Sequence, residues 1–202
     1  MSRRADVVRR GFDILFVLLL LPVALPLIAI ASVAIVLESP GSPFFIQERI
    51  GKNGRPFRIW KLRTMVPDAA SKGAGLYFEA NDPRVLRVGA RLRQFSLDEL
   101  PQLLNVARGE MAVVGPRPPH PKIYQKHRAE YCRILTVRPG LTGPAQVGGR
   151  NELPRSRRLE IEAEYVSRRS LATDVFILLR TPLVVLRGDG VSMTQSQADV
   201  ER

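Results

Sequence analysis

Two adjacent carboxylates, Asp98 and Glu99, are the residues best suited to chemistry in a chain otherwise rich in arginine. Paired acids of this kind can ligate a metal ion or transfer protons. Ser96 precedes Glu99 by the spacing of a helix capping box, so Asp98 is expected in the first turn of a helix, where the helix dipole keeps a carboxylate ionised. The structural alternative is that Ser96 and Glu99 only cap the helix and that Asp98 lies on its surface.

Pro101 follows the acid pair closely. A proline at this position removes a helical hydrogen bond and crowds the carbonyl group of Leu97. The turn that carries the acid pair is therefore predicted to be separate from the helix that follows at residues 100–106, which should end near Gly109.

Basic residues on a predicted hairpin are candidates for binding a phosphate. Residues 44–50 and 56–65 have the character of two strands, joined through Asn53 and Gly54, a favoured hairpin turn. Lys61 and Arg63 fall at alternate positions of the second strand and so share one face. That face suits a phosphate ligand, and it equally suits a solvated basic strand edge.

Two further arginines lie in stiff turns. Arg117 stands between Pro116 and Pro118, which fix the backbone around its guanidinium, and Arg138 begins a second stiff basic turn, predicted at residues 138–143. A ligand phosphate is the natural partner of a guanidinium presented in this way. The alternative is a rigid surface loop.

Composition narrows the choice of partner. The 202 residues suffice for one domain with a real core, and the formal net charge of +12 predicts a polyanion, either a nucleic acid, an anionic membrane surface or a phosphorylated substrate. The single cysteine, Cys132, excludes an internal disulfide and a cysteine-based zinc site, and it is expected to be a small buried hydrophobe. His120 and His127 have no metal-ligand spacing and are expected to be structural or surface residues.

An uncharged apolar stretch at residues 14–37 would form a helix about 36 Å long, against about 30 Å of bilayer hydrocarbon. Arginines and lysines flank it on both sides, and a single straight span cannot place both flanks in the cytoplasm. Pro22 and Pro26 lie near its middle, where a bend is expected. These features favour a re-entrant hairpin with limbs at 14–21 and 22–37, broken at Pro22, over a signal anchor or a cleaved signal peptide.

The fold class predicted is α+β and mostly helical, with this re-entrant hairpin, the small β-hairpin and interfacial amphipathic helices. Residues 1–40 form the membrane hairpin, 41–190 a membrane-associated catalytic domain on the cytoplasmic side, and 191–202 a flexible tail. Helices are expected around 89–93 and at 123–136, 153–168 and 171–186, the last interrupted at Pro182 and placed in the core or in the plane of the interface. Residues 66–82 are expected to be helix and then loop.

Several motifs in order along the chain resemble the bacterial sugar transferase family, the monotopic phosphoglycosyl transferases, in their minimal catalytic form. The resemblance runs from about Arg9 to Gly190 and rests on KLRTM at residues 61–65, DPRV at 82–85, Arg93, SLDELPQLLNV at 96–106, GEM at 109–111, VGPRP at 114–118 and RPGLTG at 138–143. Leu62 and Glu110 depart from the residues most frequent in the family, and neither belongs to the acid pair.

The resemblance implies transfer of a sugar 1-phosphate from a UDP-sugar to polyprenyl (undecaprenyl) phosphate, with magnesium and with release of UMP, at the bacterial inner membrane. Asp98 would be the nucleophile that forms a covalent phosphosugar intermediate, with Mg²⁺ bound at Asp98 beside Glu99. The role of Glu99 is open between metal ligand and proton transfer. The candidates for binding substrate phosphates or nucleotide are Lys61, Arg63, Arg93, Arg117 and Arg138. The partners implied are these substrates and membrane lipids, with a homodimer left open.

Two other classes of function compete with this interpretation. One is a membrane-tethered basic binding protein, but no nucleic-acid-binding motif is present and aromatic residues make up only 6% of the chain, few for base stacking. The other is a membrane phosphohydrolase that uses the same acid pair and delivers the sugar phosphate to water. We therefore expect no nucleic-acid partner.

Overall fold

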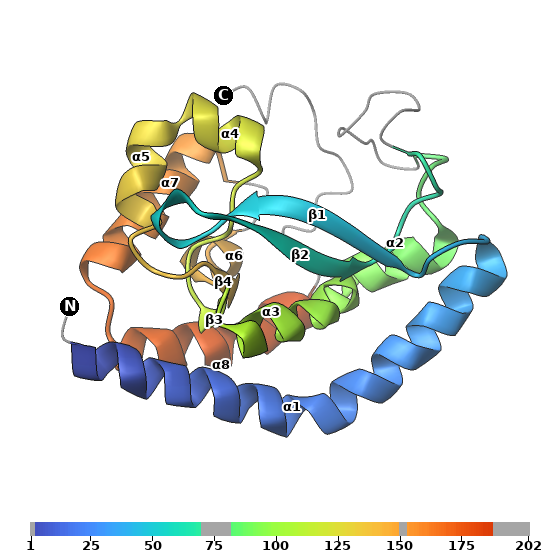
Figure 1. The fold of residues 1–202 in the computed structure, drawn as a ribbon, viewed down its shortest axis with the longest axis horizontal. Helices are drawn as coiled ribbons and strands as arrows, with labels where there is room; N and C mark the ends of the chain where they lie inside the picture. Colours follow the sequence, from blue (N-terminus) through green and yellow to red (C-terminus); the bar gives the residue numbers. More distant parts are fainter. Residues whose placement is uncertain (1–2, 70–81, 150–152, 188–202) are drawn as a thin grey trace.

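A computed structural model of the chain describes residues 3–69, 82–149 and 153–187. The predictions for most of the segment 66–82 and for the tail lie outside these residues. The described part is mostly helical with two small sheets, as predicted for an α+β fold (Figure 1).

The first helix, α1 (Arg3–Glu38), contains the apolar stretch. By length and composition, α1 could cross a membrane. Only 17% of its most apolar 18-residue segment is buried by the rest of the protein. The predicted break at Pro22 is wrong, because helical structure is continuous through Pro22 and Pro26. Figure 1 shows the helix bent near its middle, as expected where a proline removes a backbone hydrogen bond within a helix that continues on both sides.

The predicted hairpin is confirmed. Strands β1 (Phe44–Ile50) and β2 (Pro56–Leu62) pair antiparallel around the short helix η1 (Lys52–Gly54). Asn53 and Gly54 have φ values of 58° and 75°, a left-handed geometry that asparagine and glycine tolerate best. The second strand ends at Leu62, three residues earlier than predicted.

The acid pair lies between two helices. Helix α2 (Arg87–Gln94) precedes it, η2 (Leu97–Gln102) carries it and α3 (Leu103–Arg108) follows. The predicted separation is confirmed, because η2 is a tight 3₁₀ helix distinct from α3, but Pro101 lies inside η2 and α3 begins at Leu103, three residues later than predicted. Gly109 ends α3 at a φ of 80°.

The second half of the chain begins with a parallel pair, β3 (Ala112–Val114) and β4 (Gly140–Thr142). The prediction of a turn at 138–143 was wrong for its last part, which is strand β4. Gly115 and Gly140 make the close approach of the two segments possible, because a Cβ on Gly140 would stand 2.1 Å from the Gly115 nitrogen. A single helix at 123–136 was also wrong: α4 (Pro121–Lys126) and α5 (Arg128–Ile134) meet at His127, whose φ of −120° leaves the helical range.

Three more helices complete the fold: α6 (Pro144–Val147), α7 (Arg155–Ser167) and α8 (Leu171–Arg187). Pro182 does not interrupt α8, contrary to the prediction. One face of α8 buries Ile177, while six of its large apolar residues are exposed, namely Leu171, Val175, Phe176, Leu179, Leu183 and Leu186. Figure 1 shows α8 beside the first half of α1. Cys132 is exposed, which corrects the expectation that it is buried.

One face of α1 belongs to the protein core, where Val17 and Ala24 pack in one cluster with Val106 and Met111. Polar contacts reinforce this packing. Arg10 donates two hydrogen bonds of 2.6 Å to the carbonyl groups of Val106 and Ala107, at the end of α3.

A second polar contact joins α1 to α8. Arg9 pairs with Asp174 at 2.9 Å, and both side chains are buried. Tyr165 of α7 donates to the other carboxylate oxygen of Asp174 at 2.6 Å. The apolar helix is therefore fastened to the body of the protein along its first half.

Candidate active site

The acid pair sits on η2 without the capping box that the sequence predicted. Ser96 has a left-handed backbone, with a φ of 54°, and its side chain makes no capping hydrogen bond. The prediction fails because the Glu99 side chain is bound by cations from other parts of the chain. The two carboxylates therefore face the protein interior, where long-range contacts determine their properties.

Glu99 is held by two cations. Its Oε1 accepts hydrogen bonds from Lys61 Nζ at 2.6 Å and from Arg117 Nη2 at 3.0 Å. Burial raises the pKa of Glu99, but the charges and hydrogen bonds of Arg117 and Lys61 outweigh it and hold the pKa well below its usual range. Glu99 is therefore an ionised carboxylate whose negative charge is balanced by Lys61 and Arg117.

Asp98 has a different environment. Its residue is 8% exposed, and its Oδ2 lies 3.9 Å from Lys61 Nζ. Within the described ranges, its carboxylate makes no hydrogen bond to the protein. Burial raises the pKa of Asp98. The Lys61 charge lowers this pKa and the Glu99 charge raises it further, and the net shift is upward. Burial therefore outweighs the stabilisation of the carboxylate that was expected from a helix dipole. Asp98 is thus a buried acid with lone pairs that no donor of the described protein uses.

The structure brings three of the predicted phosphate-binding cations to the acid pair. Lys61 reaches it from β2, and Arg117 reaches it from the loop after β3 with a side chain that is 48% exposed. Arg93 of α2 donates to the Thr64 hydroxyl at 2.8 Å, and its charge lowers the pKa of Asp98. Cations from three different elements therefore converge on the two acids.

Arg63 lies elsewhere. Strand β2 ends at Leu62, so the alternation that placed Arg63 on the face of Lys61 stops one residue too early. The Arg63 guanidinium instead donates to the carbonyl groups of Ser39 and Pro40, just after the end of α1. It therefore holds the end of the apolar helix.

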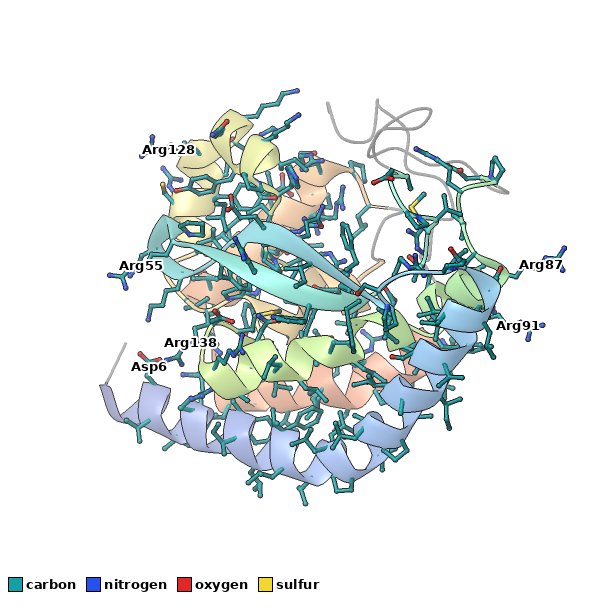
Figure 2. The ribbon with its side chains drawn as sticks, turned by 45° about the vertical axis from the view of Figure 1, so that its right-hand side comes forward. Asp6, Arg55, Arg87, Arg91, Arg128 and Arg138 are labelled. Atoms are coloured by element: carbon teal, nitrogen blue, oxygen red, sulfur yellow. The ribbon has the colours of Figure 1, made fainter. Side chains whose placement is uncertain are left out.

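Arg138 also lies outside the group around the acid pair. It lines a separate cavity of about 340 Å³ together with Asp6, Asp13 and Arg169, and neither Asp98 nor Glu99 contributes to that cavity. Figure 2 shows Arg138 close to Asp6 at the start of α1. A role for Arg138 in binding the substrate phosphate therefore has no support in this geometry.

Comparison with known proteins decides the family. The sequence model described as bacterial sugar transferase matches residues 4–188 of the chain. The chain belongs to the bacterial sugar transferase family. It is therefore an enzyme, a transferase, and the resemblance inferred from the motifs is confirmed.

Relatives within the bacterial sugar transferase family cover most of this chain. It is 43% identical over 198 residues to the UDP-glucose:undecaprenyl-phosphate glucose-1-phosphate transferase of Caulobacter vibrioides, over 91% of this chain and 72% of that protein. It is 39% identical over 193 residues to the exopolysaccharide production protein ExoY of Rhizobium meliloti, over 88% and 85%. A UDP-N-acetylgalactosamine-undecaprenyl-phosphate N-acetylgalactosaminephosphotransferase of Aeromonas hydrophila is 39% identical over 189 residues, which are 91% of this chain and 44% of that protein.

Asn105 lies beside the site, and no role was predicted for it from the sequence. It is fully buried on α3, and its side chain accepts from the Trp60 amide at 3.2 Å and donates to the Arg58 carbonyl at 2.7 Å and to Glu110 at 2.8 Å. It thereby ties α3 to β2 next to Lys61. The sequence signal that could have identified it is a single asparagine within a short, mostly apolar helix.

Glu162 of α7 was also missed. Its Oε1 accepts the backbone N–H of Arg117 at 3.0 Å, and the residue is 4% exposed. Burial raises its pKa to about 7, against the opposing effects of the Arg117 hydrogen bond and of the nearby arginine charges. Glu162 therefore positions the loop that presents Arg117.

Glu162→Gln is expected to flatten the dependence of stability on pH. A carboxyl group with a pKa near 7 when folded and about 4.3 when unfolded binds more protons in the folded state between these values, so wild-type stability falls as pH rises from about 4.3 to about 7. Glutamine keeps the acceptor for Arg117 without this cost, and should raise the free energy of unfolding at pH 8 by about 1–3 kcal/mol. Thermal unfolding in detergent from pH 5 to 8 measures the effect.

Glu160→Gln, on the exposed face of the same helix, is the matched control and should leave the wild-type slope in place. Equal slopes in the wild type and in Glu162→Gln would show that Glu162 does not titrate in this range.

The residues of the site fit a magnesium ion that also binds the substrate. Among the described residues there is no group of three or more His, Cys, Asp and Glu that could enclose a metal. Magnesium is commonly bound through one or two carboxylates together with substrate phosphates and water. Asp98 has the unused lone pairs for this, while Glu99 Oε1 already accepts from two cations.

Proposed function

We propose that this enzyme transfers a sugar 1-phosphate from a UDP-sugar to undecaprenyl phosphate and releases UMP, at the cytoplasmic face of the bacterial inner membrane. The names of the relatives support the class of reaction. The observation that carries the proposal is the contrast within the acid pair, in which Glu99 is neutralised by Lys61 and Arg117 and the Asp98 carboxylate makes no hydrogen bond to the described protein.

In the first step, an Asp98 carboxylate oxygen attacks the β-phosphorus of the UDP-sugar. A bond forms between this oxygen and phosphorus, and the bond from phosphorus to the bridging oxygen breaks. UMP leaves with the bonding electron pair, and the sugar phosphate remains on Asp98 as an acyl phosphate. The nucleophile is active as its carboxylate, and the charges of Lys61, Arg93 and Arg117 favour this form against burial.

In the second step, a phosphate oxygen of the lipid attacks the same phosphorus. The bond between phosphorus and Asp98 breaks, the carboxylate is regenerated, and the product is a lipid diphosphate sugar. Two anions meet in each step, so the reaction needs fixed positive charge around the phosphoryl oxygens. Lys61, Arg93 and Arg117 provide it here, and magnesium held by Asp98 and the substrate phosphates would add to it.

The proposed setting at a membrane is supported by apolar surface. Most of the apolar side chains of α1 face outward, and α8 presents a second exposed apolar face beside it. Basic residues at both ends of α1 favour a bent helix that enters and leaves by one leaflet. A soluble nucleotide sugar and a lipid phosphate can then meet at the bilayer surface.

The function is tested by UMP release from detergent-solubilised protein. UDP-glucose and UDP-N-acetylgalactosamine head the panel of donors, because relatives are named for both sugars. We expect one donor to give UMP only when undecaprenyl phosphate is present, because the covalent intermediate otherwise stops the reaction after one turnover. Continuous UMP release without lipid would identify a hydrolase, and the absence of UMP from every donor with folded protein would refute the transferase reaction.

A further inference from the structure

Arg49 is a cation near the acid pair that the reaction described above does not use. It lies on β1, on the same face of the hairpin as Lys61, because Lys61 pairs with Phe45 and side chains alternate from Phe45 through Gln47 to Arg49. Its guanidinium donates to Gln47 Oε1 at 2.7 Å and, at the 3.5 Å limit, to the carbonyl of Pro118, the residue after Arg117. Its Nε is buried and has no hydrogen-bond partner in the described protein.

Arg49 also has no counter-ion among the described residues, since its hydrogen bonds go to neutral oxygens. Burial and the neighbouring Arg117 charge lower its pKa to about 10, with Glu99 and Tyr131 opposing, so it is still charged at neutral pH. A poorly solvated cation without an anion is costly unless a ligand supplies the negative charge.

Contacts place Arg49 relative to the two acids. Lys61 Nζ lies within 4 Å of carboxylate oxygens of both Asp98 and Glu99. Among the described residues Arg49 forms no salt bridge with either acid, and it contacts Pro118, the residue after the Arg117 that binds Glu99. Arg49 is therefore farther from the Asp98 carboxylate than Lys61 is.

We propose that Arg49 binds the α-phosphate of the UDP-sugar, the phosphate that leaves as UMP. This inference rests on the proposed function, in which Asp98 attacks the β-phosphorus. The α-phosphate is then the phosphoryl group farther from Asp98, and it gains negative charge as the bridging bond breaks. A guanidinium with three N–H groups left after its bonds to Gln47 and Pro118 can donate to that phosphate through a charge-assisted pair.

The competing explanation is that Arg49 only braces the Pro118 carbonyl and so positions Arg117. The two roles predict different results for Arg49→Gln and Arg49→Lys. A bracing role affects the Glu99 and Arg117 pair and should alter catalysis with every substrate. Binding of the α-phosphate should appear in the affinity for UMP and spare the lipid acceptor.

Binding of UMP to the full chain in detergent, measured by calorimetry, is the decisive experiment. We expect Arg49→Gln to weaken UMP binding about tenfold or more, Arg49→Lys to restore part of the loss, and the KM for undecaprenyl phosphate to stay within about twofold of wild type. Arg55→Gln is the matched control, because Arg55 lies on the same hairpin and points away from the protein in Figure 2. Melting temperatures close to that of the wild type establish that the variants are folded.

Unchanged UMP affinity in folded Arg49→Gln would overturn the inference, and so would a rise in the KM for undecaprenyl phosphate in place of the UMP effect. Failure of the proposed function is distinguishable, because it would appear as a wild-type protein that turns over no UDP-sugar. If the wild-type protein is active and folded Arg49→Gln binds UMP normally, only the role proposed for Arg49 is refuted.

Discussion

Asp98→Asn protein is expected to release UMP from its UDP-sugar at less than about one thousandth of the wild-type rate, because loss of a nucleophile removes the covalent route altogether. Asparagine has nearly the same shape as aspartate but no ionisable oxygen. The fold should be retained, since the Asp98 carboxylate makes no hydrogen bond to the described protein and Glu99 keeps its contacts with Lys61 and Arg117. UMP release with lipid present measures the rate.

Mass spectrometry without the lipid acceptor distinguishes a nucleophile from a positioning group. The wild-type protein mixed with its donor should gain the mass of one sugar phosphate, and the Asp98→Asn protein should not. Glu99→Gln is the neighbouring comparison: it leaves Asp98 in place but unbalances Lys61 and Arg117, so slow adduct formation is expected. An adduct at full rate on Asp98→Asn protein would contradict the assignment of the nucleophile.

Asn105→Ala is expected to have the largest effect on stability among single substitutions near the site. It removes three hydrogen bonds that a fully buried side chain makes to partly buried partners, and leaves the Trp60 N–H and the Arg58 carbonyl without their side-chain partner. Each buried polar group left unsatisfied costs about 1–3 kcal/mol, so the free energy of unfolding should fall by about 3 kcal/mol or more. Denaturant unfolding in detergent, followed by tryptophan fluorescence of Trp60, measures this change.

Gln125→Ala is the control for loss of an amide side chain, because Gln125 is exposed on α4. It should change the free energy of unfolding by less than about 0.5 kcal/mol. If Asn105→Ala were equally mild, β2 would not depend on α3 for its position, and the placement of Lys61 would need another explanation.

Features set by neighbouring residues were predictable from the sequence. Strand β1 has the predicted bounds, the Asn53-Gly54 turn closes the hairpin, and the turn with the acid pair is a 3₁₀ helix that contains Pro101 and is distinct from α3. In each case a local preference for a backbone conformation agrees with the packing around it. Similarity to a known family supplied the role expected of Asp98, which the spacing of the acid pair alone left open, and it left the role of Glu99 unassigned.

Features set by distant residues were not predictable. Arg63 had the right charge and spacing for the site, yet its position depends on where β2 stops pairing with β1. The pairing of β3 with β4 joins segments 28 residues apart, from Ala112 to Gly140, and no local pattern encodes it. The contacts that position Arg117 arise in the same way, because Glu162 reaches its backbone from a helix far along the chain.

The two arginine contacts along α1 have a consequence for how the enzyme meets its lipid. Arg10 joins the start of α1 to the end of α3, and Arg63 holds the chain just after the end of α1. With both ends fastened, the bent helix cannot slide or straighten without breaking these bonds. In the proposed membrane setting, α1 and the acid pair would therefore move as one body, and the depth at which α1 inserts would set the height of Asp98 relative to the lipid phosphate.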